Sequence, residues 1–432
     1  MRNRTLATLV VVVLWSMSTH GKPSSSGDEP HYLMVARSLV ADHDLDVANN
    51  YANGEGRLVG ADGLTMGPHA RVNAKGHTWS VHDVGLSVLA APAFAAGSAL
   101  ANRIDERTLA RFRQSRGLFA YSVVSVFLIF LTAIGASLLN SALREIAPAR
   151  HAAIVTLCVA FSPPVLPHSF LVFPEAPALA LTCLALWIAY RPDARLSTMT
   201  ATWGALAIGL MPWFHRKFSF FVLALAFAIW RHKREWFAAR AMTVRAGIAA
   251  VFIAPQLGLH LFTWINWGQI GGPQLEGLPF SLAGILVGVA GLLLDRSRGL
   301  LPYSPLAIVA IAAWVMCGRR FVIWLLPIAA LFLPLAAYAT WNAGYSPAAR
   351  FLVPLMPLLA LPAVEAMANR TFRRVALAPL ALQIALSANG WQHPRALWPG
   401  EVGENRLYDV IPGFGQTIAR IFPVLDHGSW KN

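Results

Sequence analysis

The chain has 432 residues, of which 56% are hydrophobic and only 13% carry a charge, and its mean hydropathy is +0.52. Because soluble domains carry about 25% charged residues, this composition excludes a soluble enzyme, a disordered protein and a nucleic-acid-binding protein. It predicts an all-α polytopic membrane protein. The net charge of +14 is then explained by basic loops on the cytoplasmic side of the membrane.

The N-terminus combines a basic start, residues 1–4, with an apolar run over residues 5–17. This pattern fits either a cleaved signal peptide or a retained membrane anchor. We favour the anchor because many more apolar runs follow. In both cases residues 20–83 are predicted to lie outside the cytoplasm.

The exported segment 20–83 is acidic and rich in histidine. It contains eight of the 21 acidic residues of the chain but only five basic ones. The spacing of its histidines matches no zinc motif such as HExxH, and we interpret them mainly as surface or acceptor-site residues. These histidines are His31, His43, His69, His77 and His82.

Apolar runs continue along the chain as far as residue 390. They lie near 84–101, 117–140, 152–170, 176–190, 199–214, 217–230, 244–264, 281–294, 303–317, 321–339, 350–368 and 374–390. The basic cluster between Arg231 and Arg245 is the strongest cytoplasmic marker. We interpret 84–101 and 281–294 as interfacial helices that do not cross the membrane. About eleven membrane crossings then remain, and the principal basic loops between the later runs all lie in the cytoplasm.

This topology predicts one transmembrane domain over residues 1–390. Its first extracytoplasmic loop covers 20–116 and carries juxtamembrane helices, and a second large outer loop covers 265–302. Residues 391–432 form a short extracytoplasmic tail.

Three carboxylates on the predicted outer face are candidates for chemistry. Asp28 and Glu29 follow the first span at once and open an amphipathic helix, where helix capping is the alternative role. Glu175 lies at the mouth of an apolar helix, where an ionisable group is costly and therefore a functional candidate. Its alternative role is that of an ordinary acid in a first helical turn.

Cations gather on the same predicted face. His215, Arg216 and Lys217 lie in a turn between two spans that should be joined outside, against the usual distribution of positive charge. A phosphate ligand would explain them, and snorkelling to lipid headgroups is the alternative. Further cations lie in the turn 295–305, as Arg296 and Arg298, and at the start of a late span, as Arg350.

Four short motifs resemble those of GT-C glycosyltransferases, in particular the protein O-mannosyltransferase and lipid A aminoarabinose transferase group. The chain departs from this group in two ways. His82-Asp83-Val84 stands where the group often has prolines. The segment 391–432 is too short to form the large soluble C-terminal domain that some members carry. The motifs are residues 27–32 (GDEPHY), 82–92 (HDVGLSVLAAP), 173–175 (FPE) and 345–357 (YSPAARFLVPLMP).

The resemblance implies a polyprenyl-phosphate sugar donor, an outer-face active site in the plasma (inner) membrane and inversion at the anomeric carbon. The expected enzyme is a hexosyl- or pentosyltransferase whose acceptor is a lipid, a glycan or a protein. Because phosphate leaves readily as an anion, one base is enough for this chemistry. We expect no nucleic-acid partner, only membrane lipids besides donor and acceptor.

Roles follow for the candidate residues. Asp28 is the expected base, Glu29 binds or orients the substrate, and Glu175 orients the acceptor or shares a metal. No cofactor is certain; a divalent cation, Mg or Mn, held by Asp28, Glu175 and His31 stays open, and no metal ligand is assigned. The expected ligands of the lipid phosphate and sugar are Arg350, Tyr345, Arg216, Lys217, His215, Arg296, Arg298, His31 and Tyr32.

Two other functions stay open at this point. A transporter or flippase of a lipid-linked substrate needs polar residues along its spans near the midplane, whereas the polar residues here crowd at one rim. A non-catalytic scaffold would leave the acidic loops without a role.

The topology is tested by a reporter fused after residue 235, in the strongest basic cluster. We expect a cytoplasmic read-out there, and an extracytoplasmic read-out from the same reporter placed after residue 62. Activity of an exported reporter at residue 235 would contradict the proposed orientation.

Overall fold

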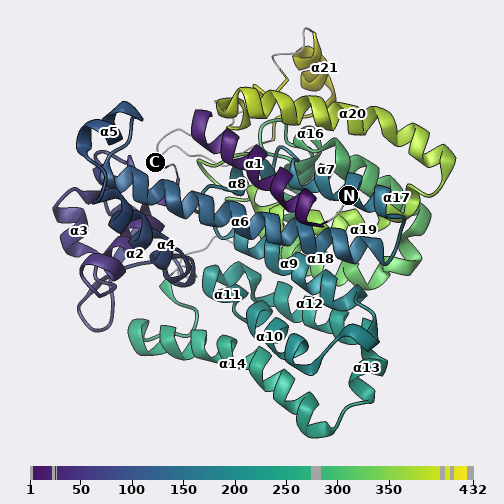
Figure 1. Cartoon of the computed structure of the whole chain (residues 1–432), viewed down its shortest axis with the longest axis horizontal. Coiled ribbons are helices and arrows are strands. Elements are labelled where there is room, and N and C mark those ends of the chain that lie inside the picture. Colours follow the sequence, from purple (N-terminus) through teal and green to yellow (C-terminus); the bar gives the residue numbers. More distant parts are fainter. Residues whose placement is uncertain are drawn as a thin grey trace.

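The computed structural model describes residues 3–21, 25, 27–273, 284–398, 404–408 and 413–425. In these ranges the chain is helical apart from one two-stranded antiparallel hairpin (Figure 1). The predictions for residues 22–24, 26, 274–283, 399–403, 409–412 and 426–432 lie outside the described residues.

The first part of the chain contains one long helix and a set of short elements. They are α1 (Asn3–Gly21), α2 (Glu29–Ala41), α3 (Ala48–Ala52), η1 (Glu55–Val59), η2 (Gly67–His69), β1 (Ala70–Val72), β2 (Thr78–Ser80), α4 (Gly85–Ala101) and α5 (Glu106–Arg111).

The middle part forms most of the bundle. Its elements are α6 (Arg116–Arg144), α7 (Ala149–Ala160), α8 (Val165–His168), α9 (Glu175–Tyr190), η3 (Asp193–Arg195), α10 (Thr198–Gly209), α11 (Met211–Phe214), η4 (Arg216–Phe218), α12 (Ser219–His232), α13 (Arg234–Ala238) and α14 (Met242–Trp267).

The last part completes it with α15 (Ile285–Leu294), α16 (Leu300–Tyr303), α17 (Pro305–Phe321), η6 (Val322–Trp324), α18 (Leu325–Ala336), η7 (Arg350–Leu355), α19 (Met356–Ala366), α20 (Arg370–Gln392), η8 (Pro394–Leu397) and α21 (Phe414–Ile421).

Three helical segments in the described ranges are long and apolar enough to cross a membrane: Arg116–Arg144, Met242–Trp267 and Pro305–Ala336. The prediction of a helical membrane protein is confirmed at this level, and the number of crossings stays a prediction. The predicted interfacial run 84–101 forms the 17-residue α4. The described part of 281–294 forms α15, with 10 residues.

Several helices begin where a short polar side chain accepts a hydrogen bond from the first turn. Ser115 accepts from the Leu118 N–H at 3.2 Å at the start of α6. Asn369 does the same for α20, from the Phe372 N–H at 3.0 Å. These caps satisfy backbone N–H groups in the first turns of two long helices.

Helix α9 lies at the centre of the bundle and packs against α6, α10, α12 and α19. Small residues allow α6 and α9 to approach closely, as is common in membranes. A Cβ added to Gly135 on α6 would lie 3.0 Å from the Ala180 Cα on α9. The close packing fixes the N-terminus of α9, where Glu175 begins the helix.

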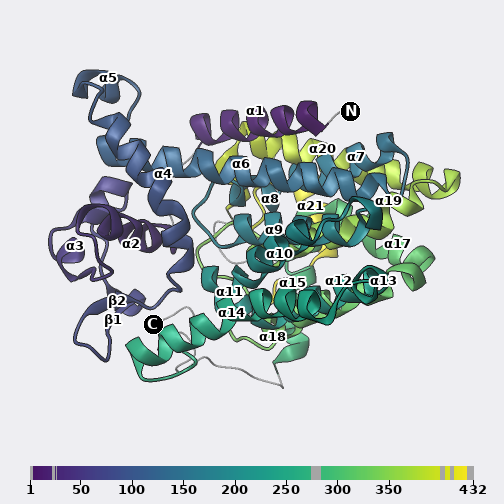
Figure 2. The same cartoon turned by 60° about the horizontal axis from the view of Figure 1, so that its bottom comes forward.

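The first outer segment forms a separate cap at one end of the bundle. Figure 2 shows α2, α3 and α4 with the hairpin β1–β2 gathered there, around the first turns of α6. Helix α2 packs against α4, and α4 against α6. The hairpin pairs Ala70 with Ser80, so residues 69 and 82 lie together at its open end.

A buried ion pair joins this cap to the bundle. The Arg216 guanidinium donates to the Asp83 carboxylate at 2.6 and 2.9 Å, and the Arg216 backbone N–H donates to its other oxygen at 2.8 Å. Only 2% of the Asp83 side chain and 11% of the Arg216 side chain are exposed. The same guanidinium also donates to the Gly271 carbonyl, after α14. One arginine therefore connects three distant segments.

Replacing Asp83 by Asn should destabilise the protein by about 3–5 kcal/mol, because it leaves the Arg216 charge buried without its partner. The measurement is unfolding of the purified protein in mixed micelles. The matched control is Glu365→Gln, which breaks the Arg320–Glu365 pair, whose side chains are 58% and 27% exposed. That exposed pair should contribute only about 0–1 kcal/mol. Equal losses in both variants would contradict the structural role of Asp83.

Candidate active site

One arginine connects two acidic residues that are far apart in the sequence. Arg350, at the start of η7, donates through its Nη1 to the Asp28 Oδ2 at 2.9 Å and through its Nε to the Glu175 Oε1 at 3.3 Å. Its guanidinium also lies over the Phe173 ring, 3.9 Å from the centroid. The structure therefore places Asp28, Glu175 and Arg350 in one cluster.

Lys217 completes this cluster from η4. Its Nζ donates to the Glu175 Oε1 at 2.5 Å and lies 4.5 Å from the centroid of the Phe351 ring. Burial lowers the pKa of Lys217 to about 8, although the Glu175 carboxylate acts in the opposite direction. Pairing with a buried acid replaces the snorkelling role considered for Lys217.

Glu175 and Tyr32 each leave a polar atom unused. Within the described part of the chain, the Glu175 Oε2 and the Tyr32 hydroxyl are buried and have no hydrogen-bond partner. Native structures seldom leave such atoms unpaired, so each calls for an explanation.

Asp28 precedes the first residue of α2, yet its side chain makes no capping hydrogen bond. Burial alone would raise its pKa, but the charge of Arg350 and the hydrogen bond from it keep the pKa of Asp28 well below its usual range. Gly27 holds the residue close to the bundle: it has a φ of +56°, and an added Cβ would lie 2.5 Å from the Tyr345 carbonyl oxygen. The carboxylate is ionised at neutral pH and paired with a cation rather than with its helix.

Glu29 lies beside Asp28 in the sequence but contacts different groups. Its Oε1 accepts from the Tyr121 hydroxyl at 2.6 Å and from the Val172 N–H at 2.8 Å. It is fully buried. Glu29 thus joins α2 to α6 and to the segment before Glu175. This connection fixes Asp28 and Glu175 relative to each other.

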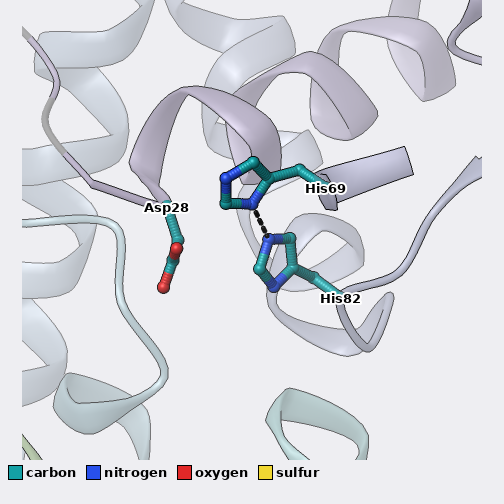
Figure 3. A group of neighbouring side chains, drawn as sticks. All are labelled: Asp28, His69 and His82. Atoms are coloured by element: carbon teal, nitrogen blue, oxygen red, sulfur yellow. Dashed lines mark hydrogen bonds between the residues drawn. The ribbon is translucent and has the colours of Figure 1, made fainter. Parts of the chain in front are cut away.

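Three histidines of the cap lie next to Asp28. The His69 Nδ1 and the His82 Nε2 are 3.0 Å apart, and Figure 3 shows both rings beside the Asp28 side chain. His31 stacks on His69 with ring centroids 3.8 Å apart, and its Nδ1 contacts the Tyr51 hydroxyl at 2.5 Å. Burial lowers the pKa of His82 to about 4 and that of His31 to about 3, so these rings are neutral at pH 7.

The metal set considered from the sequence differs from the one in the structure. In the described ranges, the group of His, Cys, Asp and Glu side chains close enough to bind one ion consists of Asp28, His69 and His82. Glu175 and His31 are not part of it. His69 and His82 take the place of His31 in this group because the hairpin brings them together, whereas the His31 Nδ1 already contacts the Tyr51 hydroxyl.

The other predicted site residues lie at varying distance from the cluster. Arg216 pairs with Asp83, and the His215 Nδ1 accepts from the Lys217 N–H at 3.2 Å. Tyr345 is exposed, with its backbone against Gly27. His215, Arg216 and Tyr345 therefore lie close to the Asp28–Glu175–Arg350 cluster, but these contacts are with other residues.

Arg296 and Arg298 support the surrounding loops. Arg296 donates to the Ala419 carbonyl at 2.7 Å, in α21. Arg298 donates to the Ser346 carbonyl at 2.7 Å and so supports the loop before Arg350. Their contacts in the structure are to backbone carbonyl groups rather than to the acidic cluster.

Sequence reasoning missed His69, His82 and Asp83 as site residues. A signal was present, because residues 70–72 and 78–80 flank a glycine-containing turn and form a short hairpin that brings the two histidines together. A zinc motif such as HExxH places its histidines on one face of a helix, whereas His69 and His82 flank the two paired strands of a hairpin. Pattern matching along the sequence therefore overlooked them.

The cluster can neutralise and orient an anionic substrate. Arg350 and Lys217 lie against aromatic rings and buried acids, where the effective dielectric constant is low and each charge acts strongly. The two cations lie beside the N-termini of α9 and α12, since Glu175 begins α9 and Lys217 lies in η4 just before α12.

No protein-family model and no curated protein sequence matches this chain. Among solved structures, ArnT from Cupriavidus metallidurans in the apo state is similar, with a TM-score of 0.51, 13% identity and coverage of 93% of this chain and 66% of that chain. The same protein bound to undecaprenyl phosphate gives a TM-score of 0.50 with the same identity and coverage.

The oligosaccharyltransferase AglB from the archaeon Archaeoglobus fulgidus, in complex with an inhibitory peptide and a dolichol-phosphate, gives a TM-score of 0.47 at 12% identity, over 99% of this chain and 60% of that chain. The chain thus spans about two thirds or less of the length of these structures. The resemblance to GT-C glycosyltransferases inferred from the sequence is confirmed in the fold: the chain has the fold of ArnT.

Proposed function

We propose that the protein is a membrane glycosyltransferase of the GT-C type that moves a sugar from a polyprenyl-phosphate donor to an acceptor hydroxyl, with inversion. The observation that carries this proposal is the Arg350 bridge between Asp28 and Glu175. It combines a base and an anion-binding group next to apolar helices. The shared fold with ArnT, which was solved bound to undecaprenyl phosphate, supports a lipid-linked donor.

The proposed reaction takes place on the extracytoplasmic face of the inner membrane. The acceptor oxygen attacks the anomeric carbon of the sugar from the side opposite the phosphate. The bond from that carbon to the phosphate oxygen breaks with its electron pair, so the lipid phosphate leaves as an anion. The acceptor hydroxyl loses its proton to Asp28.

Asp28 suits the role of base better than Glu175 does. Its side chain is 26% exposed, whereas that of Glu175 is fully buried. An acceptor hydroxyl can therefore reach the carboxylate of Asp28 from outside. Glu175 is better placed to hold Lys217 and Arg350 in position.

Arg350 connects donor binding to the strength of the base. A phosphate bound to the guanidinium would draw it away from the Asp28 carboxylate. Since the charge of Arg350 is what keeps the pKa of Asp28 low, this shift would make Asp28 a stronger base when the donor is present. Lys217 and Arg350 would then stabilise the leaving phosphate.

The remaining candidates fit around this centre. Tyr32 and His31 lie on α2 next to Asp28 and would contact the sugar or the acceptor, whereas Tyr345 would contact substrate at the exposed rim. Arg298 would position the loop before Arg350. The proposed topology keeps about eleven crossings, and the acceptor is a lipid, a glycan or a protein.

Replacing Asp28 by Asn should lower kcat by about 100- to 10,000-fold, the usual contribution of a general base. Transfer of a radiolabelled sugar from a polyprenyl-phosphate donor by the purified protein measures the effect. Asp62→Asn, at an exposed position of the same loop, is the matched control and should retain normal turnover. Near-normal kcat in the Asp28 variant would remove this residue from the role of base.

Activity should fall in alkaline solution because Lys217 loses its proton there. Its pKa of about 8 means that the side chain is charged below this pH and neutral above it. The KM for the lipid-phosphate donor should therefore rise above pH 8 in the natural protein. In Lys217→Arg the guanidinium stays charged, and the rise should disappear. Parallel pH profiles for both proteins would exclude Lys217 as the titrating group.

A further inference from the structure

A group of three potential metal ligands lies directly beside the proposed base. One ligand atom each from Asp28, His69 and His82 can be chosen so that all three lie within 4.8 Å of one another. The His69 Nδ1 and His82 Nε2 are 3.0 Å apart. Two nitrogens bound to one tetrahedral zinc ion lie about 3.3 Å apart, so only a small adjustment is needed.

The fold builds this group from two elements. His69 ends η2 immediately before β1, and His82 follows β2, while the Val81 N–H donates to the His69 carbonyl at 2.9 Å. The hairpin thus fixes one histidine relative to the other. Asp28 comes from the start of α2, so the three side chains converge from opposite sides (Figure 3).

Neighbouring groups orient these three side chains, as outer-shell partners do in metal sites. His31 stacks on His69 at 3.8 Å, and Arg350 contacts the Asp28 Oδ2 at 2.9 Å. Tyr32 packs against His82 with ring centroids 5.0 Å apart.

The charge balance of the site leaves room for a cation once an anionic donor is bound. Arg350, Lys217 and Arg216 are each paired with a carboxylate, from Asp28, Glu175 and Asp83 respectively. In the absence of substrate these three cations and three carboxylates balance, so a bound lipid phosphate would add net negative charge to the site. A divalent ion next to Asp28 would supply two positive charges at this point.

We propose that Asp28, His69 and His82 bind one divalent transition-metal ion, with zinc as the preferred metal, beside the lipid-phosphate site. Two imidazoles and one carboxylate favour zinc over magnesium, which prefers oxygen ligands. Three protein ligands leave a fourth position open, as in catalytic rather than structural zinc sites. The role of the ion near the leaving phosphate rests on the proposed function, whereas its binding does not.

The test is zinc binding to the full-length chain, purified in detergent and stripped of metal with a chelator. Zinc is titrated against a chromophoric competitor, and the bound metal is counted by mass spectrometry. We expect one zinc per chain, with no displacement by excess magnesium. His69→Gln and His82→Gln should each weaken binding by about 100-fold or more, since loss of an outer-shell partner alone costs about 10- to 100-fold.

Glutamine is chosen because its amide can still form hydrogen bonds, so the hairpin should stay folded. The visible spectrum of bound Co²⁺ is a second measurement of which side chains bind the metal. The control is His77→Gln in the same hairpin, whose side chain is 57% exposed and contacts Asp46; it should bind zinc normally. Absence of stoichiometric zinc, or equal losses in the His77 and His82 variants, would overturn the proposal.

A transfer assay on the same samples separates this inference from the proposed function. Sugar transfer that survives complete metal removal would contradict a metal beside the phosphate, while leaving the glycosyltransferase intact. Tight zinc binding through His69 and His82 in a protein without any transfer from a lipid-phosphate donor would support the metal site and contradict the proposed enzyme.

Discussion

The contact on which the site depends is the buried guanidinium of Arg350 between two carboxylates. Asp28 lies 322 positions away in the sequence and Glu175 lies 175 positions away. A charge buried without a partner is strongly destabilising, so the buried Arg350 guanidinium depends on the two carboxylates that it bridges. Formation of the site and the packing of α2, α9 and η7 around it are therefore parts of one event.

Neighbouring acids in this region have different roles because their partners differ. Glu29 accepts from the neutral Tyr121 hydroxyl and from a backbone N–H, which makes it a connection between elements. Asp28 pairs with a cation that a phosphate could also bind, which makes it responsive to a substrate. Two adjacent carboxylates thus differ in role: Glu29 connects structural elements, and Asp28 forms an ion pair with Arg350.

The site lies at a junction rather than inside one unit. The cap contributes Asp28, His69 and His82, and the bundle contributes Glu175, Lys217 and Arg350. The Asp83–Arg216 pair fixes this junction next to Lys217. Because the groups come from both sides, the geometry of the site depends on how the cap is held against the bundle.

Composition and hydrophobic runs determined that the protein is helical and membrane-associated, since apolar segments of this length have few other stable environments. The cost of placing charges beside such segments also singled out Asp28, Glu175, Lys217 and Arg350. Only the tertiary structure decided which acid pairs with which cation, that Arg296 and Arg298 bind backbone carbonyls, and that a hairpin brings His69 to His82. These outcomes depend on contacts between distant segments, and a one-dimensional pattern carries no information on the distance between them.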